Sequence, residues 1–189
     1  MDAHVHLSSD ALVHAATILL LIVAALAPVD GVYIHLIRLK LHARPESWHE
    51  HVWHTVRTGL FLPATYALFG VVSGGALLWT GIALAVIDQA VEIVDMASEK
   101  DSRASIGGLG SFEYILHGLL TLVRSAAIAL SLAARPASAF SLTAPNIVAQ
   151  LDEPYGWLVR QLYPGAIVLA LVHVWLAWRY RPQQVRSAT

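Results

Sequence analysis

Residues 50–54 read Glu-His-Val-Trp-His and residues 113–117 read Glu-Tyr-Ile-Leu-His, and each of these Glu-x-x-x-His stretches opens a long apolar segment. The apolar segment before each stretch also carries acids or a histidine toward its far end. Side chains four positions apart share one face of a helix, so each glutamate points the same way as its histidine. The pattern predicts a duplicated helical hairpin built around a polar core.

The composition indicates a membrane protein. Hydrophobic residues make up 57% of the chain and charged residues 13%, and the mean hydropathy is +0.60, whereas charged residues are about a quarter of an ordinary soluble domain. Apolar runs fall near residues 11–37, 55–73, 76–98, 112–134 and 158–178. All but the second exceed the roughly 20 residues that a helix needs to cross a bilayer. We therefore expect an all-α, multi-pass integral membrane protein with five transmembrane helices, in a bacterial inner membrane.

Several other classes are disfavoured. The chain has no cysteine, so it makes no disulfide and has no thiolate chemistry. Its formal net charge is −1 and its basic residues form no stripe, so we expect no nucleic-acid partner. The first ten residues carry two acids and no Lys or Arg, unlike the basic start of a signal peptide, so the first apolar run is expected to remain as a helix.

Basic residues predict the orientation, because Lys and Arg near helix ends are retained on the cytoplasmic side. Three groups alternate with the apolar runs: Arg38, Lys40 and Arg44; Lys100 and Arg103; Arg179, Arg181 and Arg186. Only Arg135 and Arg160 fall on the other side. Five spans with the N-terminus outside and the C-terminus cytoplasmic place all three groups inside. Both Glu-x-x-x-His stretches then lie at the cytoplasmic face.

The whole chain, residues 1–189, is expected to form a single membrane domain. Its first four helices form the bundle, and Pro28 is expected to loosen the first of them just before Asp30. The predicted parts are hairpin one (11–73), hairpin two (76–134), an external loop (135–157) and a fifth helix (158–180).

Asp88, Glu92 and Asp95 form one acidic stripe on the third helix, and their mutual repulsion requires a positive partner. Arg57 and Arg124 lie within the second and fourth helices. Counting depth at about 1.5 Å per residue pairs Asp88 with Arg124, and Asp30 with Arg57.

The side chains left at one level form a candidate metal site. The predicted ligands are His35, Glu50, His54, Glu92, Glu113 and His117. Supporting residues or alternate ligands are Asp30, Asp88, Asp95, His51, Arg57 and Arg124. Carboxylate and imidazole ligands without sulfur favour iron, manganese or zinc. Six ligands are too many for one zinc tetrahedron, so we predict two metal ions, with iron as the first choice and manganese or zinc as alternatives.

This ligand set resembles that of the ferritin-like di-iron and di-manganese carboxylate proteins, four-helix bundles in which Glu/His pairs come from two helices and single ligands from the other two. The resemblance implies a dinuclear centre. It departs from the family in its Glu-x-x-x-His spacing, one residue longer, and in offering His35 or Asp30 from the first helix. With open positions facing the bilayer, such a centre suits oxygen-dependent oxidation of an apolar or lipid-like substrate. No nucleotide or flavin fingerprint is present, so a separate electron donor is expected.

Other interpretations stay open at this stage. Acid and histidine chains also serve proton- or metal-ion-coupled transporters, and two of His35, His54 and His117 could bind haem b for electron transfer. The buried charges could instead be ionic contacts that only join helices. Glu50 could close a capping box with Ser47. His42 reads as a solvated loop residue and His173 as a lone histidine. The chain could also assemble as a homo-oligomer or within a larger membrane complex.

Overall fold

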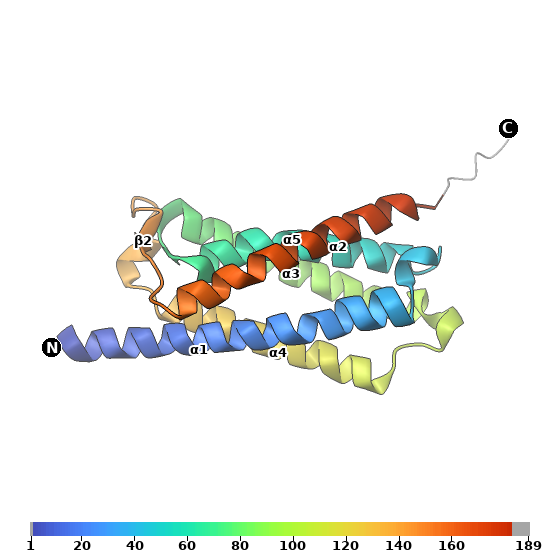
Figure 1. The fold of residues 1–189 in the computed structure, drawn as a ribbon, viewed down its shortest axis with the longest axis horizontal. Coiled ribbons are helices and arrows are strands. Elements are labelled where there is room, and N and C mark those ends of the chain that lie inside the picture. Colours follow the sequence, from blue (N-terminus) through green and yellow to red (C-terminus); the bar gives the residue numbers. More distant parts are fainter. Residues whose placement is uncertain (1, 183–189) are drawn as a thin grey trace.

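Five long helices run along one axis in the computed structural model, which describes residues 2–182 and the side chains from residue 10 onward (Figure 1). The predicted all-helical architecture is confirmed. The helices are α1 (Asp2–Pro28), α2 (Trp48–Thr65), α3 (Gly75–Ser102), α4 (Ser111–Ala133) and α5 (Tyr155–Arg179).

Four helical segments are long and apolar enough to cross a membrane: Asp10–Ala43, Gly75–Ser102, Ser111–Ala133 and Tyr155–Arg179. The membrane assignment is thereby supported. Helix α2 is not among them. Its hydropathy is low because it carries Glu50, His51 and His54, which it buries in the protein interior.

Two of the helices change to a wider π-helical form near one end. Helix α1 continues as a π-helix over Val29–Arg38 directly after Pro28, and α2 continues as one over Tyr66–Gly70. A π-helix closes its hydrogen bonds over five residues, so Asp30 and His35 come to lie on the same side of the chain. Both are buried. The break expected at Pro28 thus becomes a change of helical pitch that orients two ionisable side chains inward.

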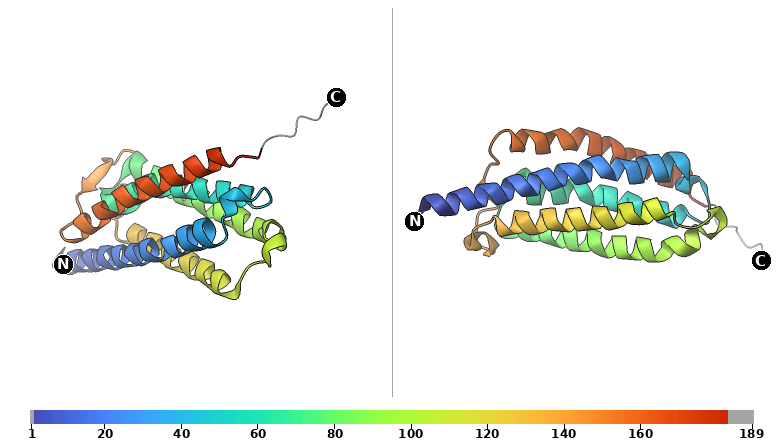
Figure 2. Two further views of the ribbon diagram at one scale, coloured as in Figure 1. Left: turned by 45° about the vertical axis from the view of Figure 1, so that its right-hand side comes forward. Right: turned by 90° about the horizontal axis from the view of Figure 1, so that it is seen from below.

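The closest helix pairs join the two halves of the chain. Helix α1 packs chiefly against α4, and α2 packs against α3 and α5; Figure 2 shows α1 lying beside α4. The sequence suggested hairpins in which α1 pairs with α2 and α3 with α4. In the structure α1 packs against α4 instead, and α3 packs against α2.

The two ends of the bundle differ in character. At one end, called the strand end here, the strands β1 (Val72–Ser73) and β2 (Ile147–Ala149) pair antiparallel. The predicted loop 135–157 thus contains a strand and a 3-10 turn, Ala137–Phe140, and α5 begins within it at Tyr155. An apolar core fills this half: Ala16, Leu20, Leu68, Phe69, Leu78, Ala127, Ala139 and Val159.

The opposite end holds the connections 39–47 and 103–110 and the last turn of α5, and it is called the loop end (Figure 1). Nearly all of the buried acids and histidines lie in the half of the bundle next to it.

Candidate metal centre

Nine ionisable side chains meet inside the bundle toward the loop end, and none is more than 7% exposed. They come from the π-helical end of α1, the first turns of α2 and α4, the last turns of α3 and the residue that directly follows α3. We call this set the central cluster: Asp30, His35, Glu50, His54, Asp95, Glu99, Arg103, Glu113 and His117.

The packed pair of α1 and α4 supplies one half of the central cluster. Asp30, His35, Glu113 and His117 each offer a ligand atom within 4.8 Å of the others. His117 Nε2 lies 3.0 Å from Asp30 Oδ1, and His35 Nε2 lies 3.0 Å from Glu113 Oε1. Two carboxylates and two imidazoles thus converge from two helices. Iron, manganese and zinc all accept such a donor set.

The packed pair of α2 and α3 supplies the other half. Glu50, Asp95 and Glu99 have ligand atoms within 4.8 Å of one another, and His54 Nε2 lies 3.0 Å from Asp95 Oδ2. The group of His35, Glu50 and His54 overlaps both halves and joins them. In each closely packed helix pair, one helix therefore contributes a Glu-x-x-x-His stretch and the other contributes two further ionisable side chains.

Arg103 lies between the two halves, and its guanidinium is completely buried. Its Nε donates to Glu50 Oε1 at 2.9 Å, and its other nitrogens reach Glu113 and, at 3.0 Å, His35 Nε2. Burial alone would lower the pKa of Arg103, but the hydrogen bonds and charges of Glu50 and Glu113 raise it above its ordinary value. Arg103 is therefore a permanent cation held by the two motif glutamates.

The central cluster carries more negative charge than Arg103 can balance. Five buried carboxylates face one guanidinium, a formal charge of −4 when the histidines are neutral. Several of its donor atoms also have no hydrogen-bond partner: His35 Nδ1, His54 Nε2, Asp95 Oδ1, Glu99 Oε1 and His117 Nδ1. Buried polar atoms without partners cost free energy. Metal ions, or protons on the histidines that contact carboxylates, would supply the missing positive partners.

Two contacts between a histidine and a carboxylate in the central cluster are short, but they do not have the geometry of hydrogen bonds. His117 Nδ1 and Glu99 Oε1 are 3.3 Å apart, and His54 and Asp95 are 3.0 Å apart, yet neither histidine nitrogen has a hydrogen-bond partner. Two ligand atoms that each lie about 2.1 Å from one metal ion are roughly 3 to 3.4 Å apart. These spacings are therefore compatible with a shared metal ion as well as with an ion pair.

A second charged layer lies next to the central cluster, deeper in the bundle, and it is balanced. It consists of Arg57, Asp88, Glu92 and Arg124, and we call it the arginine layer. Arg57 lies 3.3 Å from Asp88 and 3.2 Å from Glu92, and Arg124 forms ion pairs with the same two acids. Two acids face two arginines, so this layer needs no metal.

The arginine layer revises the predicted pairings. The pair of Asp88 and Arg124 is confirmed. The pair of Asp30 and Arg57 is wrong, because Asp30 faces α4 and contacts His117, while Arg57 faces α3. Glu92, a predicted ligand, accepts hydrogen bonds from Arg124 and Thr121 in the arginine layer. Asp30 and Asp95, expected to support the ligands or to serve as alternate ligands, lie among the possible donors.

Three further expectations change. Ser47 donates to the carbonyl oxygen of Leu41, and Glu50 accepts from Ser102 and Arg103, so the capping box is wrong. His51, expected to support the ligands or to serve as an alternate ligand, turns away from the central cluster. Its ring stacks on that of His173, which is therefore not a lone histidine.

Sequence reasoning also missed Glu99 and Arg103. The acidic stripe of Asp88, Glu92 and Asp95 continues by one helical turn to Glu99. Arg103 lies four positions after Glu99 and therefore on the same face.

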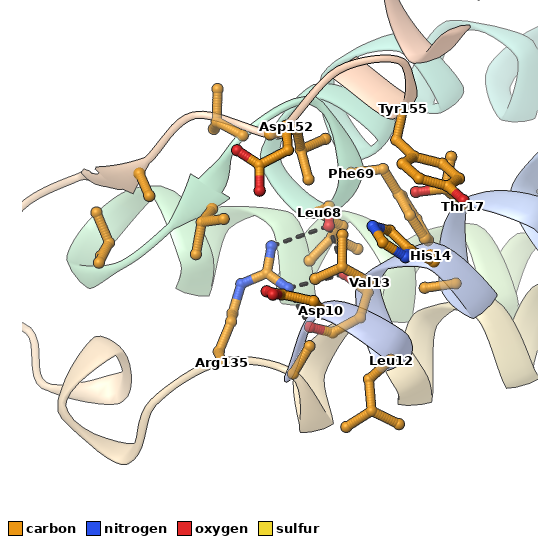
Figure 3. Close-up of a pocket in the computed structure, with 18 of the residues that line it drawn as sticks. Asp10, Leu12, Val13, His14, Thr17, Leu68, Phe69, Arg135, Asp152 and Tyr155 are labelled. Atoms are coloured by element: carbon orange, nitrogen blue, oxygen red, sulfur yellow. Dashed lines mark hydrogen bonds between the residues drawn. The ribbon is translucent and has the colours of Figure 1, made fainter. Parts of the chain in front are cut away.

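A cavity of about 520 Å³ lies at the strand end, away from the central cluster, where Asp10, His14, Asp152 and Tyr155 line it together with Arg135 (Figure 3). The Arg135 guanidinium donates to backbone carbonyls, among them that of Leu68. Burial lowers the pKa of Arg135 to about 10. Arg135 thus joins the end of α4 to the π-helical end of α2.

Comparison of the chain with protein-family models, with curated proteins and with solved structures found no match. The resemblance to the ferritin-like carboxylate proteins stays a prediction, carried by the donor set of the four packed helices.

Proposed function

We propose that this chain is a membrane-embedded metalloprotein whose central cluster holds two metal ions, with iron as the first choice and manganese or zinc as alternatives. The proposed activity is the oxygen-dependent oxidation of an apolar or lipid-like substrate dissolved in the bilayer. The observation that carries the proposal is the uncompensated charge of the central cluster. Two divalent cations would cancel its formal charge of −4, which is set by five carboxylates and Arg103.

Each metal ion is assigned to one packed helix pair. The first would be held by residues of α1 and α4: Asp30, His35, Glu113 and His117. The second would be held by residues of α2 and α3: Glu50, His54, Asp95 and Glu99. When bound, a pair of iron or manganese ions would supply the redox chemistry that activates dioxygen, which zinc ions cannot supply. Electrons would come from a separate donor.

Arg103 has a distinct role in this proposal. It binds one glutamate from each half, Glu50 and Glu113, and so holds both carboxylates in place. Charge-assisted hydrogen bonds of this kind are strong and geometrically specific. The arginine layer closes the opposite side of the cluster with balanced ion pairs. The donors are thereby oriented before any ion is bound.

The proposed topology has five spans, with the N-terminus outside and the loop end cytoplasmic. Helix α2 and its π-helical continuation cover residues 48–70 and pack against α3. The basic residues support the orientation. Those exposed at the loop end are Arg38, Lys40, Arg44, Lys100, Arg179 and Arg181, whereas the strand end has the buried Arg135 and the exposed Arg160, which pairs with Glu153. This asymmetry follows the positive-inside rule.

The rival functions are less well supported by the contacts. Asp30 Oδ1 lies 3.0 Å from His117 and 3.5 Å from His35, which leaves no space for a porphyrin between these histidines. A carrier needs a polar route through both halves of the membrane. The half at the strand end instead has an apolar core, which includes Leu20, Phe69 and Leu78.

Metal analysis of the full chain purified in detergent tests the proposal. We expect two equivalents of metal in the wild-type protein and a loss of at least one in H117A and in E113Q. H49A alters an exposed histidine outside the cluster and is the matched control. Full metal content in both cluster variants would contradict the ligand assignment. The oxidase activity is tested separately by dioxygen uptake of the reduced, iron-loaded protein in lipid nanodiscs, and absence of uptake would contradict it.

A further inference from the structure

An exposed basic patch lies at the loop end, where the connection 39–47 meets the end of α5 (Figure 1). The indole Nε1 of Trp48 donates to the backbone carbonyl oxygen of Ala177 at 3.2 Å, and the ring centroids of His42 and Tyr180 lie 4.9 Å apart. These contacts hold the two segments side by side. We call the exposed cations that they carry the loop-end patch: Arg38, Lys40, Arg44, Arg179 and Arg181.

The positive charge of the loop-end patch is not balanced by neighbouring acids. Among the described residues, no carboxylate forms an ion pair with any of its five cations, whereas the other arginines pair with carboxylates, apart from Arg135, which donates to backbone carbonyls. Residues 38–49 and 177–182 contain these five cations and one acid, Glu46, so their formal charge is +4. A surface of one sign attracts a partner of the opposite sign and raises its association rate.

A series of side-chain rings leads from the loop-end patch to the central cluster. Tyr180 lies within the patch and is 42% exposed, whereas His42 beside it is 9% exposed and is not the solvated loop residue that the sequence suggested. The ring centroid of His42 lies 5.6 Å from that of His51. His51 directly follows Glu50, a proposed metal ligand. Two ring contacts and one peptide bond thus connect the patch to the proposed metal site.

We propose that the loop-end patch is the docking surface for the electron donor, and that this donor is a soluble acidic protein that carries one electron. The inference rests on the proposed function, which requires electrons from outside the chain. Two docking events deliver two electrons, which reduce a pair of ferric ions to the ferrous state and leave two carriers oxidised. Electron-transfer complexes have small, weak interfaces, so a partner of this kind depends on complementary charge for rapid association.

Anionic lipid headgroups also bind basic surfaces next to a membrane. Two features favour a protein partner over lipid. Arg44 and Arg181 lie beyond the ends of the apolar spans, which finish at Ala43 and Arg179, so both can reach past the headgroups. The ring series of Tyr180, His42 and His51 also opens within the patch, and binding of a headgroup has no use for such a connection to the interior.

The test measures binding of an acidic [2Fe–2S] ferredoxin to the full chain in phosphatidylcholine nanodiscs. At low ionic strength we expect R179E to bind about tenfold more weakly than the wild type, mainly through slower association. R160E reverses an exposed arginine at the other end of α5, so it is the matched control and should bind like the wild type. In 1 M salt, where charges are screened beyond about 3 Å, the effect of R179E should disappear. The basic carrier cytochrome c should not bind.

Equal ferredoxin binding by R179E and the wild type, or no binding by the wild type, would overturn the proposal. If R179E instead only loses phosphatidylglycerol that co-purifies with the wild type, the patch binds lipid and the proposal is also wrong.

The same probe separates the docking surface from the dinuclear centre. Docking needs only the loop-end patch, so the metal-free protein should bind ferredoxin as the metal-loaded protein does. If the central cluster holds no redox metal, this charge-dependent binding will persist, but reduced ferredoxin mixed with the protein without oxygen will stay reduced. If the patch is not the docking surface, iron-loaded R179E will oxidise reduced ferredoxin as fast as the wild type does.

Discussion

Replacing Arg103 with methionine gives the sharpest test of the charge balance in the central cluster. R103M removes the guanidinium and keeps an apolar side chain of similar length. In the metal-free protein it leaves Glu50 and Glu113 without their cation, in a place where neither Arg103 nor Glu50 is exposed to solvent. Removing one partner of a buried ion pair costs about 3–5 kcal/mol. We expect the free energy of unfolding of the metal-free protein to fall by that amount.

Metal ions should reverse much of this loss. Two divalent cations supply positive charge to the same carboxylates, so metal-loaded R103M is expected to lose clearly less stability than the metal-free variant. The measurement is unfolding in mixed detergent micelles with and without metal. R103K retains the charge but not the planar fork that binds two carboxylates at once, so it should lie between R103M and the wild type.

A matched control is available at the strand end. Arg160 forms an ion pair with Glu153, but their side chains are 50% and 61% exposed. Exposed pairs contribute little to stability, so R160M should unfold like the wild type. Metal-free R103M that is as stable as R160M would refute the placement of Arg103 between the two glutamates. A loss that metal ions do not reduce would refute the shared role of Arg103 and metal in balancing the charge.

Three further predictions test separate parts of the structure. E92Q alters the arginine layer and should keep both metal equivalents of the central cluster. It should lower the melting temperature, because Arg124 then faces one acid fewer. Loss of metal in E92Q would show that Glu92 is a ligand after all. G81A should destabilise the protein by about 1–3 kcal/mol by overpacking, since its Cβ would lie 2.8 Å from Ala67 Cβ and 2.9 Å from Leu68 Cδ2, whereas at Gly118 a Cβ meets nothing within 4 Å and G118A should be tolerated. Removing metal with a chelator should lower the melting temperature of the wild type, and two equivalents should restore it; a melting temperature indifferent to metal would contradict the dinuclear proposal.

The sequence predicted most of the helices and most of the donors, because both depend on local patterns. Apolar runs located the long helices, and four-residue spacing placed Glu113 with His117 on one face. Glu99 was missed because the apolar run ends near residue 98, whereas α3 continues to Ser102. The last turn of α3 is polar and reads as a loop, although Glu99 within it points into the bundle. Arg103 follows this turn directly and reads as an exposed loop residue, whereas its side chain is buried.

What the sequence could not predict is which helices pack together. Counting depth along the helices led to the expected contact of Asp30 with Arg57. The partner of Asp30 is instead His117, on α4. The change to a π-helix after Pro28 adds to the difference, because it brings His35 onto the same side as Asp30. Depth along straight helices gives the level of a residue but not the neighbour that it faces.

The observed pairing also explains why a duplicated motif can make one centre. If each predicted hairpin packed on itself, each Glu-x-x-x-His stretch would be completed within its own half, and the two halves could separate. Instead α4 completes its donors with Asp30 and His35 of α1, and α2 completes its donors with Asp95 and Glu99 of α3. Every proposed metal ion would therefore link the first half of the chain to the second. Arg103 adds a further link, because it joins Glu50 to Glu113. Metal binding and closure of the bundle are then one event, so loss of either ion should loosen contacts throughout the loop end.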